Sequence, residues 1–403
     1  MENNIPHILI LGLLMLTGLM AGRFATRFGL PHIVAYVAAG VLFSPALLGN
    51  TLGISVSNWS EPITMGALGI IAYLIGGSIT IPQMRRMGKS IFSCAAGGAL
   101  GAVLVVTVII FPFAPEVGKS GAFQLALALG AIASTTAPAA TIAVLHQYRA
   151  HGPLSSTLLG VVAVDDVLGI IIFSLMLAFA AGESLSSSLG PAFIEIIGSL
   201  LIGGILGILL AFAGRRIHQG GLRLPLILSN VFLVIGLADA LHLSPLLSAM
   251  TLGFATRWLM KAGADRLFAP IDYFEEMVFV IFFTMAGAQF EANVFMNHFG
   301  LVLVYFFARV VGKVAGATLG AKFGKAPPSV QRYLGIAMLP QAGIAIGLAL
   351  ALGHHPAFSE ISHILINVIL AATLLNEVLG PIAVRFALIK AGELGIKRGK
   401  LKS

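Results

Sequence analysis

The chain has 403 residues, of which 58% are hydrophobic and only 10% are charged. Soluble domains carry about 25% charged residues, so this composition excludes an ordinary soluble protein and predicts a polytopic membrane protein. The formal net charge is +8, and the single cysteine, Cys94, excludes an internal disulfide framework.

Apolar stretches long enough to cross a bilayer recur along the whole chain, separated by glycine, proline or charged residues. In chain order they occupy residues 5–22, 30–48, 62–80, 90–112, 122–145, 154–180, 191–213, 222–240, 243–257, 271–288, 299–321, 332–352 and 361–385. The sequence therefore predicts an all-α fold with about thirteen transmembrane helices. No basic region precedes the first segment, which favours a retained helix over a cleaved signal peptide.

Lysine and arginine are concentrated in alternate loops. The basic residues after the odd-numbered segments are Arg23, Arg27, Arg85, Arg86, Lys89, Arg149, Arg215, Arg216, Arg223, Arg257, Lys261, Arg266, Lys322, Lys325 and Arg332. The opposite loops contain Lys119 alone. We expect the protein in the cell's inner (plasma) membrane. Because cytoplasmic loops carry the positive excess, we expect its N-terminus outside and its C-terminus in the cytoplasm. This topology explains the net charge, so we expect membrane lipid and no nucleic acid as a partner.

Most acidic residues, Glu377 among them, are expected near segment ends, where water or lipid headgroups can reach them. Three charged residues lie deep within the apolar segments. Asp165 and Asp166 interrupt the run "LLGVVAVDDVLGIIIFSLML", and Asp166 lies about 18 Å from the start of its segment at 1.5 Å per residue. Lys313 lies about 18 Å from the outer end of its own segment. An ionised side chain at the bilayer centre costs about 2.5–3.5 kcal/mol, so charges at this depth indicate an ion pathway.

Two segments are interrupted at the same depth. The fifth contains Ser134-Thr135-Thr136-Ala137-Pro138, and the twelfth contains Pro340-Gln341-Ala342-Gly343. A break in mid-membrane frees backbone carbonyls, which is how many transporters build an ion site. One break precedes the diacid helix and the other follows the lysine helix. With the seventh segment as a linker, the two halves form two six-helix repeats of inverted topology, with broken helices crossing in the core.

These features resemble bacterial Na⁺/H⁺ antiporters of the NapA type, in the monovalent cation:proton antiporter superfamily that also includes NhaA. The similar stretches, in order, are "LPHIVAYVAAGVLFSP", "TTAPAATIAVLHQYRAHGPL", "VVAVDDVLGIIIF", "FFTMAGAQFE" and "VVGKVAGATLGA". The resemblance implies a homodimer and an elevator-like cycle, in which an ion-carrying core moves against a dimerisation domain. The implied dimerisation domain comprises 1–80 and 222–288, the core 90–180 and 299–385, the linker helix 191–213 and the short basic cytoplasmic tail 386–403.

The resemblance also implies the residues of the ion site. Asp166 is the implied main cation ligand and proton acceptor, because burial disfavours a charged carboxylate and allows H⁺ to compete with Na⁺. Asp165 is the implied partner of Lys313 when Na⁺ is absent. Thr136 matches the family's threonine, and with the two aspartates it completes the implied Na⁺ site.

Four further residues are expected around this site. Thr135 can offer oxygen to the same cation, although Thr135 and Ser134 can equally cap a broken helix. Arg309 stands one turn before Lys313 on the same face, and we expect a structural role for it in preference to lining the outer approach. Gln341 is neutral where many relatives carry a charged residue, which leaves the ion preference open.

The expected function is exchange of Na⁺ or Li⁺ for H⁺, with two protons per sodium ion because two acids and a lysine share the site. Two alternatives stay open: K⁺/H⁺ exchange at the same site, and symport of organic anions with sodium. We expect neither enzyme activity nor a cofactor, since intramembrane aspartyl proteases need their two acids on separate helices. His354 and His355 are expected to be solvated in an outer loop.

Overall fold

The structure is a computed structural model. It describes residues 6–28, 30–49, 56, 59–78, 81–113, 118–181, 185–217, 219–290, 296, 298–341, 345–346, 348–349, 352 and 358–395. Within the helices it leaves out the side chains of residues 81–87, 118–120, 166, 174, 177–181, 185–189, 192, 262 and 272.

The part of the chain that the structure describes folds into helices without strands, which confirms the all-α prediction. The α-helices are α1 (His7–Ala25), α2 (His32–Leu42), α4 (Ser60–Ser78), α5 (Ile81–Ile110), α6 (Gly118–Ala133), α7 (Pro138–Gln147), α8 (Pro153–Ala181), α9 (Leu185–Arg216), α10 (Gly220–Ala240), α11 (Pro245–Met260), α12 (Asp265–Asp272), α13 (Glu275–Ala288), α15 (Phe299–Phe323), α16 (Pro328–Ala337) and α18 (Ser362–Ala391). Nine helical stretches among the described residues are long and apolar enough to cross a membrane.

The tenth expected segment, 271–288, begins too early. Residues 265–272 form the separate short helix α12, and α13 starts at Glu275 after a turn at Tyr273. The hydropathy pattern missed α12 because its sequence, "DRLFAPID", mixes charged and apolar residues instead of forming an apolar run.

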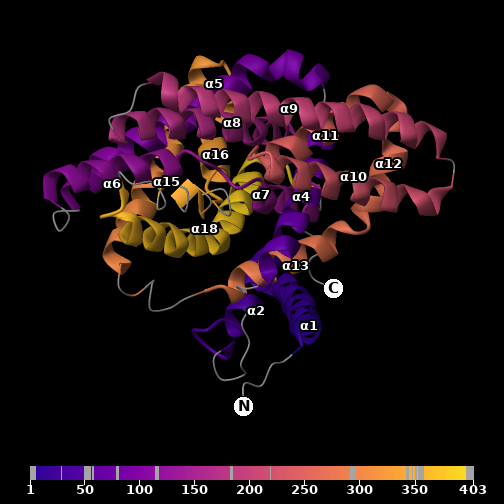
Figure 1. Ribbon diagram of the computed structural model, residues 1–403, viewed down its shortest axis with the longest axis horizontal. Coiled ribbons are helices and arrows are strands. Elements are labelled where there is room, and N and C mark those ends of the chain that lie inside the picture. The colour runs from indigo at the N-terminus through magenta and orange to yellow at the C-terminus, as the bar shows by residue number, and fades with distance from the viewer. Residues whose placement is uncertain are drawn as a thin grey trace.

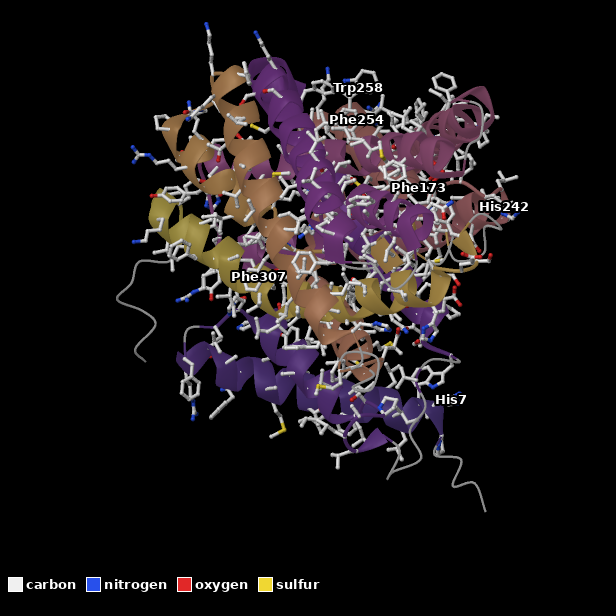
Figure 2. The ribbon with its side chains drawn as sticks, turned by 90° about the vertical axis from the view of Figure 1, so that its left-hand side faces the viewer. His7, Phe173, His242, Phe254, Trp258 and Phe307 are labelled. Carbon is white, nitrogen blue, oxygen red and sulfur yellow. The ribbon has the colours of Figure 1, made fainter. Side chains whose placement is uncertain are left out.

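Close packing of α5 against α15 forms the centre of one half of the molecule. The two helices lie alongside each other in Figure 2, in purple and orange. Glycines permit this approach, because a Cβ added at Gly316 would lie 2.1 Å from the carbonyl oxygen of Gly97. Small residues at such contacts let helix backbones come together inside a membrane, where dispersion contacts replace the hydrophobic effect.

A second group of helices packs beside the first, and α2 of this group contacts α18. Helix α2 packs against α1 and α13, and α4 packs against α11. Figure 1 shows α1, α2 and α13 together in the lower part of the view, with α9 crossing the upper part. Helix α9 contacts both α8 and α11, so it links the two groups.

Helix α18 runs six residues past the expected end of the last segment, to Ala391. Pro381 does not end it, as is common in membrane helices, where neighbouring groups satisfy the freed carbonyl. Glu377, which the sequence places near the water-accessible end of this segment, therefore lies at the middle of α18 and is only 5% exposed. The expectation that water or lipid headgroups reach it is wrong.

Candidate ion-binding site

Two breaks in the helices meet at the centre of the molecule. Helix α6 ends at Ala133 and α7 begins at Pro138, while α16 ends at Ala337, just before Pro340. The backbone N–H of Ala137 donates to the carbonyl of Pro340 at 2.8 Å, so the two non-helical segments are in direct contact. Proline lacks an N–H and cannot continue the ladder of helical hydrogen bonds, which explains why both breaks lie next to one.

Two hydroxyls cap the end of α6. Ser134 Oγ donates to the carbonyl of Ala131 at 2.7 Å, and Thr135 Oγ1 donates to the carbonyl of Ile132 at 2.9 Å. The same two carbonyls also accept the backbone N–H groups of Ser134 and Thr135, so the hydroxyls reinforce a tightened last turn of α6. The hydroxyls of Ser134 and Thr135 thus occupy the capping positions that the sequence allowed for them.

Arg309 of α15 holds the two breaks together. Its guanidinium donates to the carbonyls of Thr135 at 2.7 Å and Ala133 at 3.2 Å, beside the first break. It also donates to the carbonyls of Leu339 at 2.6 Å and Pro340 at 3.5 Å, at the second break. The side chain is 1% exposed, so it neither lines an outer approach nor reaches water. Two helix C-termini each contribute about half a negative charge, which together offset the positive charge of the buried arginine.

A polar network extends from Arg309 to a third helix. Arg309 Nη1 donates to Asn376 Oδ1 of α18 at 3.3 Å, and Asn376 Nδ2 donates to Gln341 Oε1 at 3.3 Å. Gln341 Nε2 donates to the carbonyl of Ile132 at 3.0 Å and contacts the hydroxyl of Tyr305 at the same distance. Gln341 therefore bridges both breaks, and the network fixes α18 to their crossing.

Lys313 lies one turn beyond Arg309 and forms the second buried cluster. Its Nζ is 3.0 Å from Asp165 Oδ2 and 2.8 Å from Thr136 Oγ1, and it also donates to the carbonyl of Ser134. Lys313 and Asp165 are both completely buried. The structure thus brings together the expected partners Asp165 and Lys313 and adds Thr136 to them.

The opposite face of α15 lies at the surface. Phe307 on that face is 60% exposed (Figure 2).

One carboxylate oxygen of this cluster is unused. Asp165 Oδ1 is buried and has no hydrogen-bond partner among the described residues. Buried polar atoms are almost always bonded, so an exception calls for an explanation such as an ion. Asp166 follows Asp165 directly on α8, and its side chain lies outside the described residues. Carboxylate and hydroxyl oxygens next to a freed backbone form a donor set suited to a hard monovalent cation.

Tyr305 and Asn376 are site residues that sequence reasoning missed. Tyr305, Arg309 and Lys313 recur every four residues on α15, and this spacing could have placed Tyr305 on the same face. Asn376 could have been noticed as a polar residue within the apolar segment "LLNEVLG". His354, His355, Ala342 and Gly343 lie outside the described residues.

Comparisons with known proteins give the same picture. Residues 12–390 match the model of the family described as "Sodium/hydrogen exchanger, transmembrane". A Na⁺/H⁺ antiporter of Enterococcus hirae is 23% identical over 388 residues, covering 92% of this chain and 96% of its own. The Na⁺/H⁺-K⁺ antiporter GerN of Bacillus cereus is 20% identical over 345 residues, covering 84% of this chain and 86% of its own.

A solved structure has the same fold. The sodium proton antiporter MjNhaP1 from Methanocaldococcus jannaschii superposes with a TM-score of 0.77 at 19% identity, over 97% of this chain and 99% of that one. The family match spans nearly the whole chain, including most of α1, both breaks and most of α18. The chain is a multi-pass membrane protein that belongs to the sodium/hydrogen exchanger family, within the monovalent cation:proton antiporters.

Proposed function

We propose that the protein is a secondary active antiporter that exchanges Na⁺ or Li⁺ for H⁺ and is of the NapA type. The observation that carries this proposal is the completely buried Asp165–Lys313 pair, whose unbonded oxygen Oδ1 lies beside the crossing of two broken helices. A charge pair at this place has no structural advantage over apolar packing, because its desolvation cost can exceed the Coulombic gain.

Coupling follows from competition at one site. Asp166 is the proposed main ligand and proton acceptor, and Asp165 and Thr136 complete the Na⁺ site. Na⁺ and H⁺ cannot occupy the same carboxylate together, so each ion leaves before the other binds. Na⁺ also competes with Lys313 for Asp165, because the lysine ammonium occupies Oδ2 when the cation is absent.

The number of ionisable groups supports an electrogenic cycle. Two acids and one lysine can take up two protons when one Na⁺ leaves, and strongly coupled groups titrate as a set. Carrying two H⁺ against one Na⁺ moves one net charge, which gains about 2.3 kcal/mol per 100 mV of membrane potential.

The cycle we propose is of the elevator type. Helices α5, α6, α7, α8, α15, α16 and α18 pack together around the site and would move as the ion-carrying core. Helices α1, α2, α4, α10, α11, α12 and α13 would form the static dimerisation domain of a homodimer. We place the protein in the plasma membrane. From the distribution of lysine and arginine, its N-terminus is outside and its basic C-terminal tail is in the cytoplasm.

Potassium is the main alternative substrate. Gln341 makes the second break neutral, and the similar protein GerN is named an Na⁺/H⁺-K⁺ antiporter. The same machinery would then exchange K⁺ for H⁺.

One experiment tests the function and separates these ions. The purified protein is reconstituted into liposomes that hold an imposed pH gradient, and Na⁺, Li⁺ or K⁺ is added outside. We expect Na⁺ and Li⁺ to dissipate the gradient and the Asp166→Asn variant to be inactive. Dissipation by K⁺ alone would establish the alternative, and no dissipation by any of the three would refute the antiporter proposal.

A further inference from the structure

A third acid lies in the same group of helices, and the proposed mechanism does not use it. Glu377 is the residue next to Asn376, at the middle of α18, and is 5% exposed. Figure 1 shows α18 between α16 and α2, and α18 packs against both. Among the described residues, Glu377 has neither a hydrogen bond nor an ion pair.

Thr373 lies one turn before Glu377 on the same face. Its Oγ1 is buried and has no hydrogen-bond partner in the described part of the chain. Other threonines on helices donate to the carbonyl four residues earlier: Thr17, Thr64, Thr141, Thr157, Thr251, Thr256 and Thr284. The Thr373 hydroxyl is therefore turned away from the position that such a residue usually adopts.

The geometry of a helix brings these two side chains together. Residues four apart have Cβ atoms about 5–6 Å from each other. Helical side chains lean toward the N-terminus, so the carboxyl group of Glu377 extends over the turn that contains Thr373. The two side chains do not bond to each other in the described structure. The O–H of a protonated Glu377 is the donor that the Thr373 oxygen lacks.

Among the described residues, no cation is paired with Glu377. Arg309 is bound by the carbonyls of two helix ends and by Asn376, and Lys313 is paired with Asp165. The described titratable or charged groups on α18 and on the elements packed against it are Tyr305, Arg309, Lys313 and Lys322 of α15, Arg332 and Tyr333 of α16, His32 and Tyr36 of α2, His146 of α7, Asp165 of α8, and His363, Arg385 and Lys390 of α18 itself. None of these makes a hydrogen bond or ion pair with Glu377 in the described structure.

An isolated ionised carboxylate in such a place is strongly disfavoured, so the group takes up a proton instead. We propose that Glu377, with Thr373, is a second proton-binding position of the ion-carrying core, neutral while buried. It binds H⁺ from water on one side of the membrane and releases H⁺ to water on the other. This inference rests on the proposed antiport. It moves one of the two protons from the group formed by Asp165, Asp166 and Lys313 to a residue outside the sodium site.

Infrared difference spectroscopy on the full-length protein in lipid reads the protonation directly. In saturating Na⁺, which replaces the proton on Asp166, we expect the wild type to show the carbonyl-stretch band of a protonated carboxylic acid at neutral pH, and Glu377→Gln to lose that band. Glu61→Gln is the matched control, because Glu61 is an exposed acid in the first turn of α4 and should leave the band unchanged. A band that persists in Glu377→Gln would overturn the proposal.

Thr373→Val provides an independent arm should Glu377→Gln fail to fold. It removes only the hydroxyl and keeps the carboxyl, so we expect the same band to shift to the position of an acid without a hydrogen bond. An unshifted band would overturn the pairing of the two residues.

Transport then tests whether the proton is exchanged. We expect Glu377→Gln to keep Na⁺-driven proton flux but to lower the ratio of H⁺ to Na⁺, measured from the membrane potential at which flux reverses. An unchanged ratio would show that Glu377 keeps its proton throughout the cycle and would refute its role as a carrier. The absence of flux in the wild type would instead refute the proposed antiport. The infrared spectra would still report whether Glu377 is protonated.

Discussion

Replacing Arg309 by methionine should destabilise the fold, because this one side chain holds both helix breaks. In its two shortest hydrogen bonds, the charged guanidinium donates to the carbonyl of Leu339 at 2.6 Å and to that of Thr135 at 2.7 Å. Such bonds are worth about 1.5–3 kcal/mol each, so their joint loss is expected to cost about 3–6 kcal/mol in free energy of unfolding. Arg309→Lys keeps the charge but provides a point donor without the planar fork, so it should lose about half of this.

The assay is unfolding of the purified variants in mixed micelles by a denaturing detergent, followed by loss of helical circular dichroism. Arg332→Met is the matched control, since Arg332 is exposed on α16 and the substitution is the same. We expect stability to fall in the order Arg332→Met, Arg309→Lys, Arg309→Met. Equal stability of the two methionine variants would refute the role of Arg309 in holding the two helix breaks together.

Further predictions concern the ion pair, the substrate competition and the helix packing. Asp166→Asn should abolish Na⁺-driven proton flux while the protein elutes as a folded species in size-exclusion chromatography; remaining flux would exclude Asp166 as the essential acceptor. Lys313→Met should lower the free energy of unfolding in detergent by about 3–5 kcal/mol, because it leaves Asp165 unpaired. Adding Asp165→Asn should restore most of this loss, and a double variant that is no more stable than Lys313→Met would contradict the pairing. The apparent KM for Na⁺ should rise by about tenfold per pH unit on the acidic side, since one proton competes with one sodium ion, and a KM independent of pH would indicate separate sites. Gly316→Ala should destabilise by about 1–3 kcal/mol through its clash with α5, whereas Gly204→Ala on α9, where nothing lies within 4 Å, should be neutral or stabilising in the same assay.

The sequence was most informative where the signal is local. A proline within an apolar segment identified both helix breaks, because the loss of one N–H acts on its own turn. Charges at mid-depth identified Asp165 and Lys313, since few other reasons exist to place them there. The pairing of these two residues could be expected from the family resemblance, and in the structure they lie 3.0 Å apart.

The partners of Arg309 could not be foreseen in the same way. They are backbone carbonyls, which every residue has, so no residue type marks them. Only the three-dimensional crossing of the two breaks brings those of Thr135 and Leu339 to one guanidinium. The same holds for Asn376, which becomes part of the site only because α18 packs beside α15 and α16.

The misplacement of Glu377 has a different origin. Its depth was inferred from an expected helix end at residue 385, whereas α18 continues to Ala391 through Pro381. Proline is a weaker stop signal inside a membrane than in water, because neighbouring groups can satisfy the freed carbonyl. An error of six residues was enough to move a carboxyl group from the expected surface to the centre of the helix bundle.

Uphill movement of sodium is the most direct test of the central claim. Liposomes containing the purified protein are made acidic inside, and radioactive Na⁺ is added outside at a low concentration. If H⁺ and Na⁺ exchange at one buried site, internal Na⁺ will rise transiently above the external concentration, and collapsing the pH gradient will abolish this accumulation. Equilibration of Na⁺ without any overshoot, at the same rate with and without the gradient, would contradict the account.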